Sequence, residues 1–528
     1  MQPFASLLER LLYTPQRNAK IALLVDYFRS VPDPDRGFGL AALADGFAFA
    51  NAKPSMVRTL ATKRTDPALF AWSYDFVGDL AETTALIWPQ RPSNRRWPSL
   101  AEVIETLNAI DKRSLPDILE IWLDTLDANG RWALLKLVTG SLRIGVSARL
   151  TKLALAQYGD KDPAEIEEVW HGIMPPYPSL FAWLDGEGDK PSFDTQPVFR
   201  PLMLAHPLEY EDIRRLDIKN YSAEWKWDGI RVQLAVVQGQ KRLYSRTGDE
   251  IGGSFPDILE AMNFEGVLDG ELLIVRNQTV GSFNDLQQRL GRKAPTTKLI
   301  EAYPAFVHLY DILFDNREDL RNATFTIRRK RLERFFEQTR PTRMDVPPVI
   351  TFETQEDLER LRASCRGTER EGLMLKRLDS VYVAGRPKGP WFKWKRDALS
   401  LDTVLMYAQR GHGRRSSFYS DFTFGAWRNN GPRQDDVELV PVGKAYFGFT
   451  DEELRQLDRW VRNHTTNRFG PVREVEPALV LEIAFDSVHR STRHKSGVAM
   501  RFPRINRIRW DKPADEADRL EQLERLIE

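Results

Sequence analysis

A lysine within an apolar, strand-like pattern is the residue of this chain best suited to covalent chemistry. Lys226 lies between two tryptophans in Glu-Trp-Lys-Trp-Asp-Gly, residues 224–229, and an alternating run follows at 230–237. Because burial disfavours an ammonium group, we expect a lowered pKa and a nucleophilic amine at Lys226. The alternative is a surface lysine beside a hairpin turn at Asp228-Gly229, and this short motif taken alone favours that alternative.

Acidic residues further along the chain could serve the same chemistry. Asp269 and Glu271 share one face of an expected strand, whose other face is apolar. Asp269-Gly270 is also a hairpin signal, and a turn there would leave Glu271 on the surface. Glu371 stands at the start of another expected strand. Carboxylates in such positions are candidate ligands for a divalent cation.

Cationic residues form the third group. In Trp-Phe-Lys-Trp-Lys, residues 391–395, a period of two directs Lys393 and Lys395 the same way, while Phe392 and Trp394 face the core. Two parallel ammonium groups suit a polyphosphate. Arg246 ends a strand just before a turn, and a cationic run covers 501–509.

The elements that must hold these residues change in character along the chain. Helical spacing of apolar residues predicts an all-α domain over residues 1–195, which ends in a polar linker. Short alternating strands with polar helices predict an α+β domain over 196–396. A strand-rich end with Gly and Asn turns, including one at Pro441-Val-Gly443, predicts a β-barrel over 397–528, closed by a terminal helix at 514–528.

Composition places the chain among ordinary globular proteins. Its 528 residues are too many for one core, and 42% are hydrophobic and 29% charged. Lys and Arg number 76 against 75 Asp and Glu, so the net charge neither supports nor excludes a polyanionic partner. The one cysteine, Cys365, excludes an intrachain disulfide and a cysteine-based zinc cluster. Since we see no secretion signal or long apolar run, we expect a cytoplasmic protein with no membrane contact.

The order of these motifs resembles the nucleotidyltransferase motifs of ATP-dependent DNA ligases. Five clusters in register carry the resemblance from Glu224 to Lys512. They are Lys-x-Asp-Gly at 226–229, Asp-Gly-Glu at 269–271, Glu-Gly at 371–372, Lys-x-Lys at 393–395 and Arg-Phe-Pro-Arg at 501–504. The resemblance implies a multidomain fold with a helical DNA-binding domain, an adenylation (nucleotidyltransferase) domain and an OB-fold.

The resemblance also implies a nucleotide site. Lys226 would attack the α-phosphate of ATP and hold AMP, Glu224 would contact the adenine amino group, and Tyr310 would stack on the ring. The family often has phenylalanine in place of Tyr310. Arg231 and Glu271 would hold the ribose side of the nucleotide.

A phosphate-binding set follows from the same resemblance. Lys393 and Lys395 would neutralise the α-phosphate, and Arg246 would meet nucleotide or nick phosphate. An arginine expected before the paired lysines matches Arg386, although Lys388 competes for that position. Strand parity directs Lys376 away from Glu371 unless a bulge intervenes, so Lys376 is not assigned to the site.

Metal ions and the leaving group complete the implied chemistry. Glu271 and Glu371 would bind Mg²⁺ or Mn²⁺, and Arg501 and Arg504 would orient pyrophosphate. The implied function is sealing of nicked double-stranded DNA by a monomer in replication, repair or recombination. An RNA ligase, a guanylyl-transferring capping enzyme and a non-enzymatic nucleic-acid scaffold are the alternatives.

The helical part carries a weaker resemblance. Residues 135–147 resemble a helix–turn segment of the DNA-binding domain in these ligases. Lys136, Arg143 and Ser147 could meet phosphates there, next to Gly140 and Gly145. An ordinary helix–helix corner is the alternative.

Overall fold

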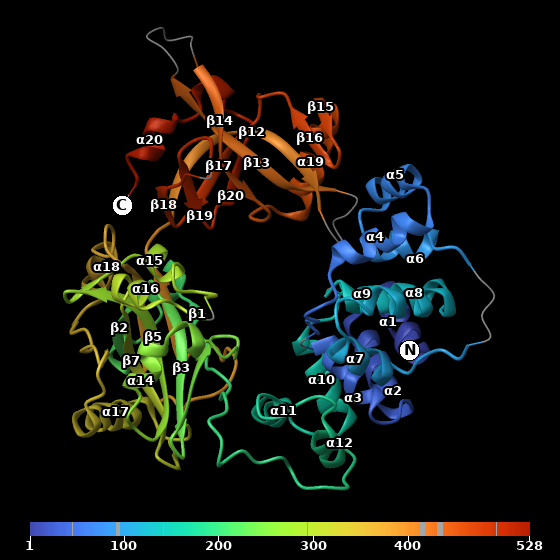
Figure 1. The fold of residues 1–528 in the computed structure, drawn as a ribbon. Coiled ribbons are helices and arrows are strands. Elements are labelled where there is room, and N and C mark those ends of the chain that lie inside the picture. Colours follow the sequence, from blue (N-terminus) through green and yellow to red (C-terminus); the bar gives the residue numbers. More distant parts are fainter. Residues whose placement is uncertain are drawn as a thin grey trace. The chain divides into compact units, whose positions relative to one another are not determined.

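The chain folds into two compact units. The structure, a computed structural model, describes residues 1–44, 46–90, 95–140, 142–292, 294–411, 418–429, 437–492 and 494–527. One unit comprises Met1–Ala48, Pro98–Ala109 and Val146–Arg396, and the other comprises Phe49–Trp97, Ile110–Gly145 and Asp397–Glu528. Helices come first along the chain, then a mixed region and then a strand-rich region (Figure 1). The predicted fold class is confirmed.

Both units contain helices from the front of the chain. The first unit holds α1 (Gln2–Tyr13), α2 (Arg17–Ser30), α3 (Asp35–Ala44), α7 (Leu100–Ala109), α10 (Ala148–Tyr158), α11 (Pro163–Trp170) and α12 (Pro178–Leu184). The second holds α4 (Pro54–Arg64), α5 (Pro67–Val77), α6 (Leu80–Ile87), α8 (Leu115–Thr125) and α9 (Ala128–Val138).

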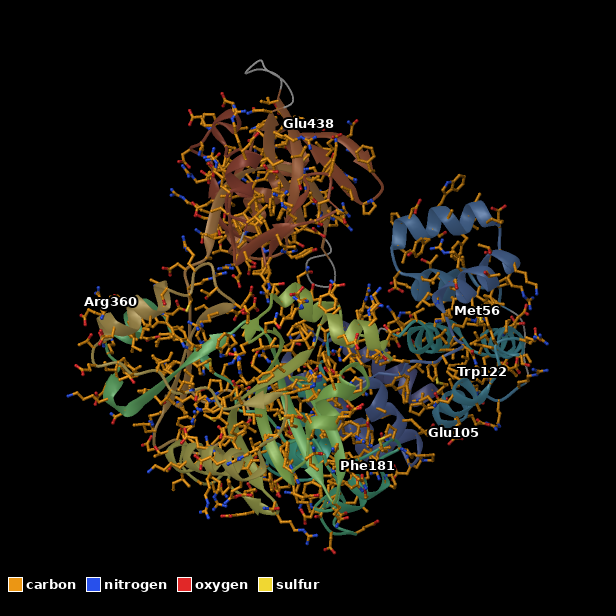
Figure 2. The ribbon with its side chains drawn as sticks, turned by 60° about the vertical axis from the view of Figure 1, so that its left-hand side comes forward. Met56, Glu105, Trp122, Phe181, Arg360 and Glu438 are labelled. Atoms are coloured by element: carbon orange, nitrogen blue, oxygen red, sulfur yellow. The ribbon has the colours of Figure 1, made fainter. Side chains whose placement is uncertain are left out.

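Apolar residues at helical spacing hold these helices together. Phe181 on α12, labelled in Figure 2, is fully buried and its ring centroid lies 6.0 Å from that of Phe28 on α2. In the described part of the chain, no helix is long and apolar enough to cross a membrane.

The mixed region contains two main sheets. One has the order β1-β11-β10-β2, built from β1 (His206–Pro207), β2 (Tyr221–Trp227), β10 (Arg370–Arg377) and β11 (Trp391–Lys395). The other has the order β4-β3-β5-β7-β8, built from β3 (Ile230–Val237), β4 (Gln240–Ser245), β5 (Gly266–Arg276), β7 (Ala305–Asp315) and β8 (Glu318–Asp319). Two short strands extend the second sheet, β6 (Thr279–Val280) and β9 (Met344–Asp345). The helices here are α13 (Tyr210–Ile213), α14 (Pro256–Ala261), α15 (Phe283–Gln287), α16 (Thr297–Ala302), α17 (Phe325–Thr339) and α18 (Gln355–Ala363).

Alternation along the strands gives each sheet two different faces. One face of the five-stranded path packs against α14 and α17, and one face of the four-stranded sheet packs against α13 and α18. A smaller apolar cluster joins the opposite faces of the two sheets and includes Ala235, Val267 and Trp391. Outside that apolar cluster, the side chains on these inner faces are polar.

A β-barrel-like domain forms the last part of the second unit. Its strands are β12 (Leu399–Arg410), β13 (Tyr419–Asn429), β14 (Val437–Ala445), β15 (Thr465–Phe469), β16 (Val472–Val475), β17 (Val480–Phe485), β18 (Ser487–Arg490), β19 (Val498–Arg501) and β20 (Arg504–Arg509). The long strand β12 pairs with β13 along one edge and with both β16 and β17 along the other. Helix α19 (Asp451–Asn463) starts at a capping box and packs its apolar face on the barrel core.

This region differs from the sequence-based expectation at one turn and in the length of its last helix. The turn predicted at Pro441-Val-Gly443 is wrong, because these residues lie inside β14, where Pro441 sits at a register shift opposite Gly425. The terminal helix is shorter than predicted and spans Leu520–Glu524 as α20. The predicted turns at 411–413 and 429–431 lie mostly outside the described residues.

Candidate active site

Strands β2, β10 and β11 present one row of polar side chains. Lys226 pairs with Gly372, which pairs in turn with Lys395, and Glu224 is linked to Lys393 through Met374 in the same way. Directly paired residues share a face of a sheet. The opposite face buries Phe392 and Trp394 in the apolar core. The predicted alternation in β11 is confirmed.

The two tryptophans beside Lys226 do not enclose it. Trp225 packs on the apolar core at the other face of β2, and the Trp227 ring lies 4.8 Å from that of His308 on β7. The Arg370 guanidinium sits 4.2 Å from the Trp225 ring and 5.0 Å from the Trp227 ring. Asp228-Gly229 is not a hairpin turn either, because β2 and β3 belong to different sheets. A Cβ at Gly229 would lie 2.5 Å from the Leu272 oxygen, so the crossing requires glycine.

A β-bulge brings Glu371 to the lysine. The register of β10 shifts between Arg370 and Gly372, and this shift turns the intervening Glu371 onto the face that carries Lys226. Glu371 Oε2 lies 2.5 Å from Lys226 Nζ, and its Oε1 lies 3.3 Å from Lys395 Nζ. One carboxylate therefore joins two of the ammonium groups.

The expected direction of the Lys226 pKa is wrong. Burial acts to lower the pKa of Lys226, but the charges of Glu371 and Glu271 and the hydrogen bond to Glu371 outweigh burial and raise it. Lys226 is therefore an ammonium ion in this state of the protein. A chemical step at its nitrogen requires that a proton leaves first.

Lys393 lies in a cluster of positive charges. Burial and then the charges of Arg386, Lys226, Lys395 and Arg246 lower the pKa of Lys393. Cations gathered at this density are suited to a polyphosphate, whose charge would relieve their mutual repulsion. The charge of Arg386 is among the main causes of the lowered pKa of Lys393, and the charge of Lys388 is not.

The second wall of the site carries Glu271. Gly270 lies within the continuous strand β5, so the hairpin alternative is excluded. Glu271 stands beside Arg231 on β3 and His308 on β7. Burial raises its pKa to about 7, with Lys226 opposing that shift and Glu371 adding to it. Glu271 thus changes charge near neutral pH.

The raised pKa of Glu271 predicts a pH-dependent gain in stability on its replacement. The folded state holds this proton up to about pH 7, whereas the unfolded state loses it near pH 4.5, so stability falls as pH rises through this interval. We expect Glu271→Gln to raise the free energy of unfolding by about 2–3 kcal/mol at pH 8 and by less than about 1 kcal/mol at pH 5. Denaturant titrations at both pH values would measure this. Glu337→Gln, at an exposed position, is the control, and an equal effect of Glu271→Gln at both pH values would contradict the assignment.

Glu224, Lys376 and Tyr310 form a cluster of charged and aromatic groups from both walls. Glu224 Oε2 lies 2.7 Å from Lys376 Nζ, while Glu224 Oε1 is buried without a hydrogen-bond partner among the described residues. The Lys376 ammonium lies 4.6 Å from the centroid of the Tyr310 ring and donates to the Tyr310 backbone oxygen at 3.2 Å. Arg329 Nη1 lies 3.7 Å from Glu224 Oε1, beyond hydrogen-bond distance, so this oxygen can accept from an amino group of a ligand.

Lys376 is the residue of this cluster that sequence reasoning left out. Parity along β10 separates Lys376 from Glu371, and the bulge at Gly372 removes that separation. A second register shift, in the pairing of β5 with β7, places both Tyr310 and Asp311 on the inner face. The glycine after Glu371 was the one local signal of the first bulge.

Arg231 is held by protein groups in this structure. Its Nη1 donates to the Met203 oxygen at 2.6 Å, and its Nη2 donates to Asp269 at 2.6 Å and to the Tyr382 hydroxyl at 3.0 Å. Of the three guanidinium nitrogens, Nε is the one buried without a hydrogen-bond partner within the described residues. Contact of Arg231 with a ribose stays a prediction.

Two further arginines of the predicted site belong to the barrel. Arg501 ends β19, and its guanidinium lies 5.2 Å from the ring of Phe502. Arg504 begins β20 and pairs with Asp486 at 3.3 Å. Their expected role toward pyrophosphate stays a prediction.

The segment resembling a DNA-binding helix–turn is only partly available for contacts. Lys136 is buried and its ammonium lies 2.6 Å from Asp79, so its expected contact with phosphate is wrong. Ser147 caps α10 by accepting from the Leu150 amide, and Arg143 is exposed. Ser141 lies outside the described residues.

The carboxylates fit a metal ion shared with a phosphate ligand. Among the described residues, no group of three or more His, Cys, Asp and Glu side chains could hold a metal ion. Glu271 and Glu371 are close enough for the charge of Glu371 to raise the pKa of Glu271. Mg²⁺ is commonly bound by one or two carboxylates together with substrate phosphates, so binding of a metal ion by Glu271 and Glu371 stays a prediction.

Comparisons with known proteins agree along the chain. Residues 202–395 match the family model "ATP dependent DNA ligase domain", and residues 415–512 match "ATP dependent DNA ligase C terminal region". A "Probable DNA ligase" from Koribacter versatilis is 31% identical, over 100% of this chain and 96% of its own. "DNA ligase 1" from Korarchaeum cryptofilum is 29% identical, over 100% of this chain and 98% of its own. The solved structure "Pmar-Lig_PreS3" has the same fold, with a TM-score of 0.61 at 15% identity over 96% of this chain and 99% of that one.

Proposed function

This chain belongs to the ATP-dependent DNA ligases and joins DNA with ATP, and we propose that the reaction runs through AMP bound covalently to Lys226. The observation that carries the proposal is the position of Lys226 Nζ, 2.5 Å from Glu371 on one side of the site. Lys393, whose pKa is lowered partly by the charge of Lys226, lies on the same face of the sheet. A nucleophile and phosphate-binding cations thus share one surface.

The first step forms the bond between lysine and AMP. Lys226 Nζ loses a proton, for which Glu371 Oε2 is the acceptor in contact, and attacks the α-phosphorus of ATP. The phosphorus–nitrogen bond forms as the bond to the β-phosphate oxygen breaks, and pyrophosphate leaves. Lys393, Lys395, Arg246 and Arg386 stabilise the charge on the phosphates, which is the main requirement of phosphoryl-type transfer.

Base and metal binding complete this step. Glu224 Oε1 accepts from the adenine amino group, Tyr310 stacks on the ring, and Arg231 and Glu271 lie on the ribose side. Glu271 and Glu371 would hold Mg²⁺ or Mn²⁺. The ion would supply positive charge that neutralises the carboxylates and phosphates.

The second and third steps act on a nick in double-stranded DNA. The 5′-phosphate oxygen takes AMP from Lys226, and the phosphorus–nitrogen bond breaks. The 3′-hydroxyl oxygen then attacks the adenylated 5′-phosphate and releases AMP, which leaves a phosphodiester bond. We propose that a monomer performs these steps and contacts mainly the DNA backbone, so binding should be indifferent to sequence and weaken with salt.

Labelling of the protein with nucleotide tests the proposal. The chain is incubated with α-³²P-labelled ATP and magnesium, quenched and separated by denaturing electrophoresis. We expect label on the protein that is released by acid and stable to base, as a phosphoramidate is. Subsequent addition of nicked duplex should transfer the label to DNA, and absence of protein-bound label would end the covalent proposal.

Arg501 gives a prediction about the order of steps. If Arg501 orients pyrophosphate, its replacement by alanine should affect the step that releases pyrophosphate. We expect Arg501→Ala to slow self-adenylation about 100-fold, the size of effect typical of one charge-stabilising group. Sealing of nicks that carry AMP already should slow less than about threefold. Equal losses in both assays would contradict the assigned role, and Arg507→Ala on the same barrel is the control.

A further inference from the structure

We infer that Tyr382 is a positioning residue of the adenylation step, acting through Asp269 and Arg231 to fix the spacing of the two walls of the site. This inference rests on the proposed function. Tyr382 lies in the segment between β10 and β11, and its side chain is buried.

The Tyr382 hydroxyl is part of a closed network of charged hydrogen bonds. It donates to Asp269 Oδ2 at 2.5 Å and accepts from Arg231 Nη2 at 3.0 Å, while that same Nη2 donates to Asp269 at 2.6 Å. Gln233 donates to the other Asp269 oxygen at 3.2 Å. Asp269 is completely buried, so each of these hydrogen bonds offsets part of the free energy that removal of its carboxylate from water costs.

The network joins elements of different sheets. Asp269 is on β5, which also carries Glu271, and Arg231 is on the neighbouring strand β3. Tyr382 and Met203, the other partners of Arg231, belong to the opposite wall: Met203 bridges to Gly385, and the ring of Tyr382 packs edge-on against Trp391 of β11 at 5.8 Å. The wall with Glu271 is therefore tied to the wall with Lys226.

This hydrogen-bond network affects the placement of the phosphate-binding residues rather than the binding of the base. The segment that carries Tyr382 also carries Arg386, whose charge acts on Lys393. Near Glu224 the walls have a separate link, the hydrogen bond from Lys376 to the Tyr310 oxygen. Backbone hydrogen bonds from Tyr382 to the Arg321 oxygen at 2.8 Å and from Phe325 to the Ser380 oxygen at 2.7 Å hold the segment itself. The Tyr382 hydroxyl therefore acts within this frame, by fixing the side chains of Asp269 and Arg231.

Removal of the Tyr382 hydroxyl should therefore impair the chemical step more than ATP binding. In-line attack depends on the placement of reacting groups to within about 1 Å. We expect Tyr382→Phe to lower the rate of self-adenylation at saturating ATP about tenfold, and to change the ATP concentration for half-maximal rate less than about threefold. Single-turnover labelling across ATP concentrations gives both quantities. A loss of stability alone would lower the labelled fraction and leave the rate of the folded molecules unchanged.

Tyr244→Phe is the matched control. The Tyr244 ring packs on the same apolar cluster, but its hydroxyl donates to the Pro197 oxygen outside the network. We expect its adenylation rate to stay within about twofold of the parent. Combining Tyr382→Phe with Asp269→Asn should be no slower than Asp269→Asn alone, because both act through one contact.

The outcomes separate this inference from the proposed function. If Tyr382→Phe is labelled at the parent rate, the positioning role is overturned while the covalent mechanism stands. The same conclusion follows if the fold-decrease in rate of the double variant equals the product of the decreases caused by Tyr382→Phe and Asp269→Asn. If the unsubstituted chain takes no label, the proposed function itself fails. Should Asp269→Asn not fold, comparison of Tyr382→Phe with Tyr244→Phe still decides.

Discussion

Replacement of Lys226 by alanine is expected to abolish covalent labelling with ATP, lowering it by at least about 10⁴-fold. Alanine offers no nitrogen for the bond to phosphorus, and Lys395, the other ammonium in contact with Glu371, lies two strands away in the sheet. Its position on β11 is fixed by strand pairing, so it cannot take the place of Lys226. Labelling with α-³²P-ATP, followed by electrophoresis, measures the loss.

Two controls separate loss of the nucleophile from damage to the site. Lys226→Arg keeps a positive charge near Glu371, but a guanidinium does not deprotonate to become a nucleophile, so we expect no labelling. Both variants should bind nicked DNA like the parent, and both should seal nicks that already carry AMP, because that step bypasses the lysine. Labelling of Lys226→Ala would show that another residue is the nucleophile.

The charge of Lys226 shows where reasoning from sequence stops. Neighbouring residues indicated burial, and burial alone lowers a lysine pKa. The groups that reverse the direction are Glu271 and Glu371, which come from two other strands far along the chain. Only the fold brings them to the lysine. The consequence is mechanistic: activation of the amine must accompany substrate binding and is not a property of the unliganded site.

The alternation of buried and exposed side chains along strands, by contrast, could be predicted from the sequence. Trp391–Lys395 was predicted residue by residue, because strict alternation of lysine with large apolar residues has one solution in a sheet with one buried face. The strand around Glu271 was predicted for the same reason, although Asp269-Gly270 inside it resembles a turn. Glycine stands there because a Cβ would lie 2.4 Å from Val307 on the neighbouring strand.

The register shifts that interrupt this alternation could not be predicted from the sequence. Two register shifts place Glu371 and Tyr310 on the inner faces, and both depend on how a partner strand lies against the bulged one. Lys376 was therefore left out of the predicted site, although it contacts Glu224. Lys136 was misjudged for a related reason, since its partner Asp79 is the N-cap residue of a different helix, α6. Pairing between residues that are distant in sequence decides where these side chains lie, and the local sequence pattern does not reveal that pairing.

The bulge at Glu371 leads to the second prediction of large effect, the loss of activity and stability in Gly372→Ala. Gly372 has a φ of +147°, a region that side chains rarely adopt, and a Cβ there would lie 2.2 Å from the Trp394 oxygen. We expect a loss of at least about 2–3 kcal/mol in the free energy of unfolding. If β10 relaxes to regular pairing, Glu371 turns away from Lys226, and labelling should fall at least about 100-fold.

Gly367→Ala supplies the comparison that isolates the bulge from the cost of a left-handed backbone. Gly367 has a φ of +72°, but a Cβ there has no neighbour within 4 Å, so only the intrinsic strain of about 1 kcal/mol is expected. Melting curves and labelling rates of both variants would be measured together. If Gly372→Ala melts and reacts like Gly367→Ala, the bulge tolerates a side chain and the position of Glu371 has another cause. If only Gly372→Ala loses labelling among molecules that remain folded, the bulge itself aligns the carboxylate with the nucleophile.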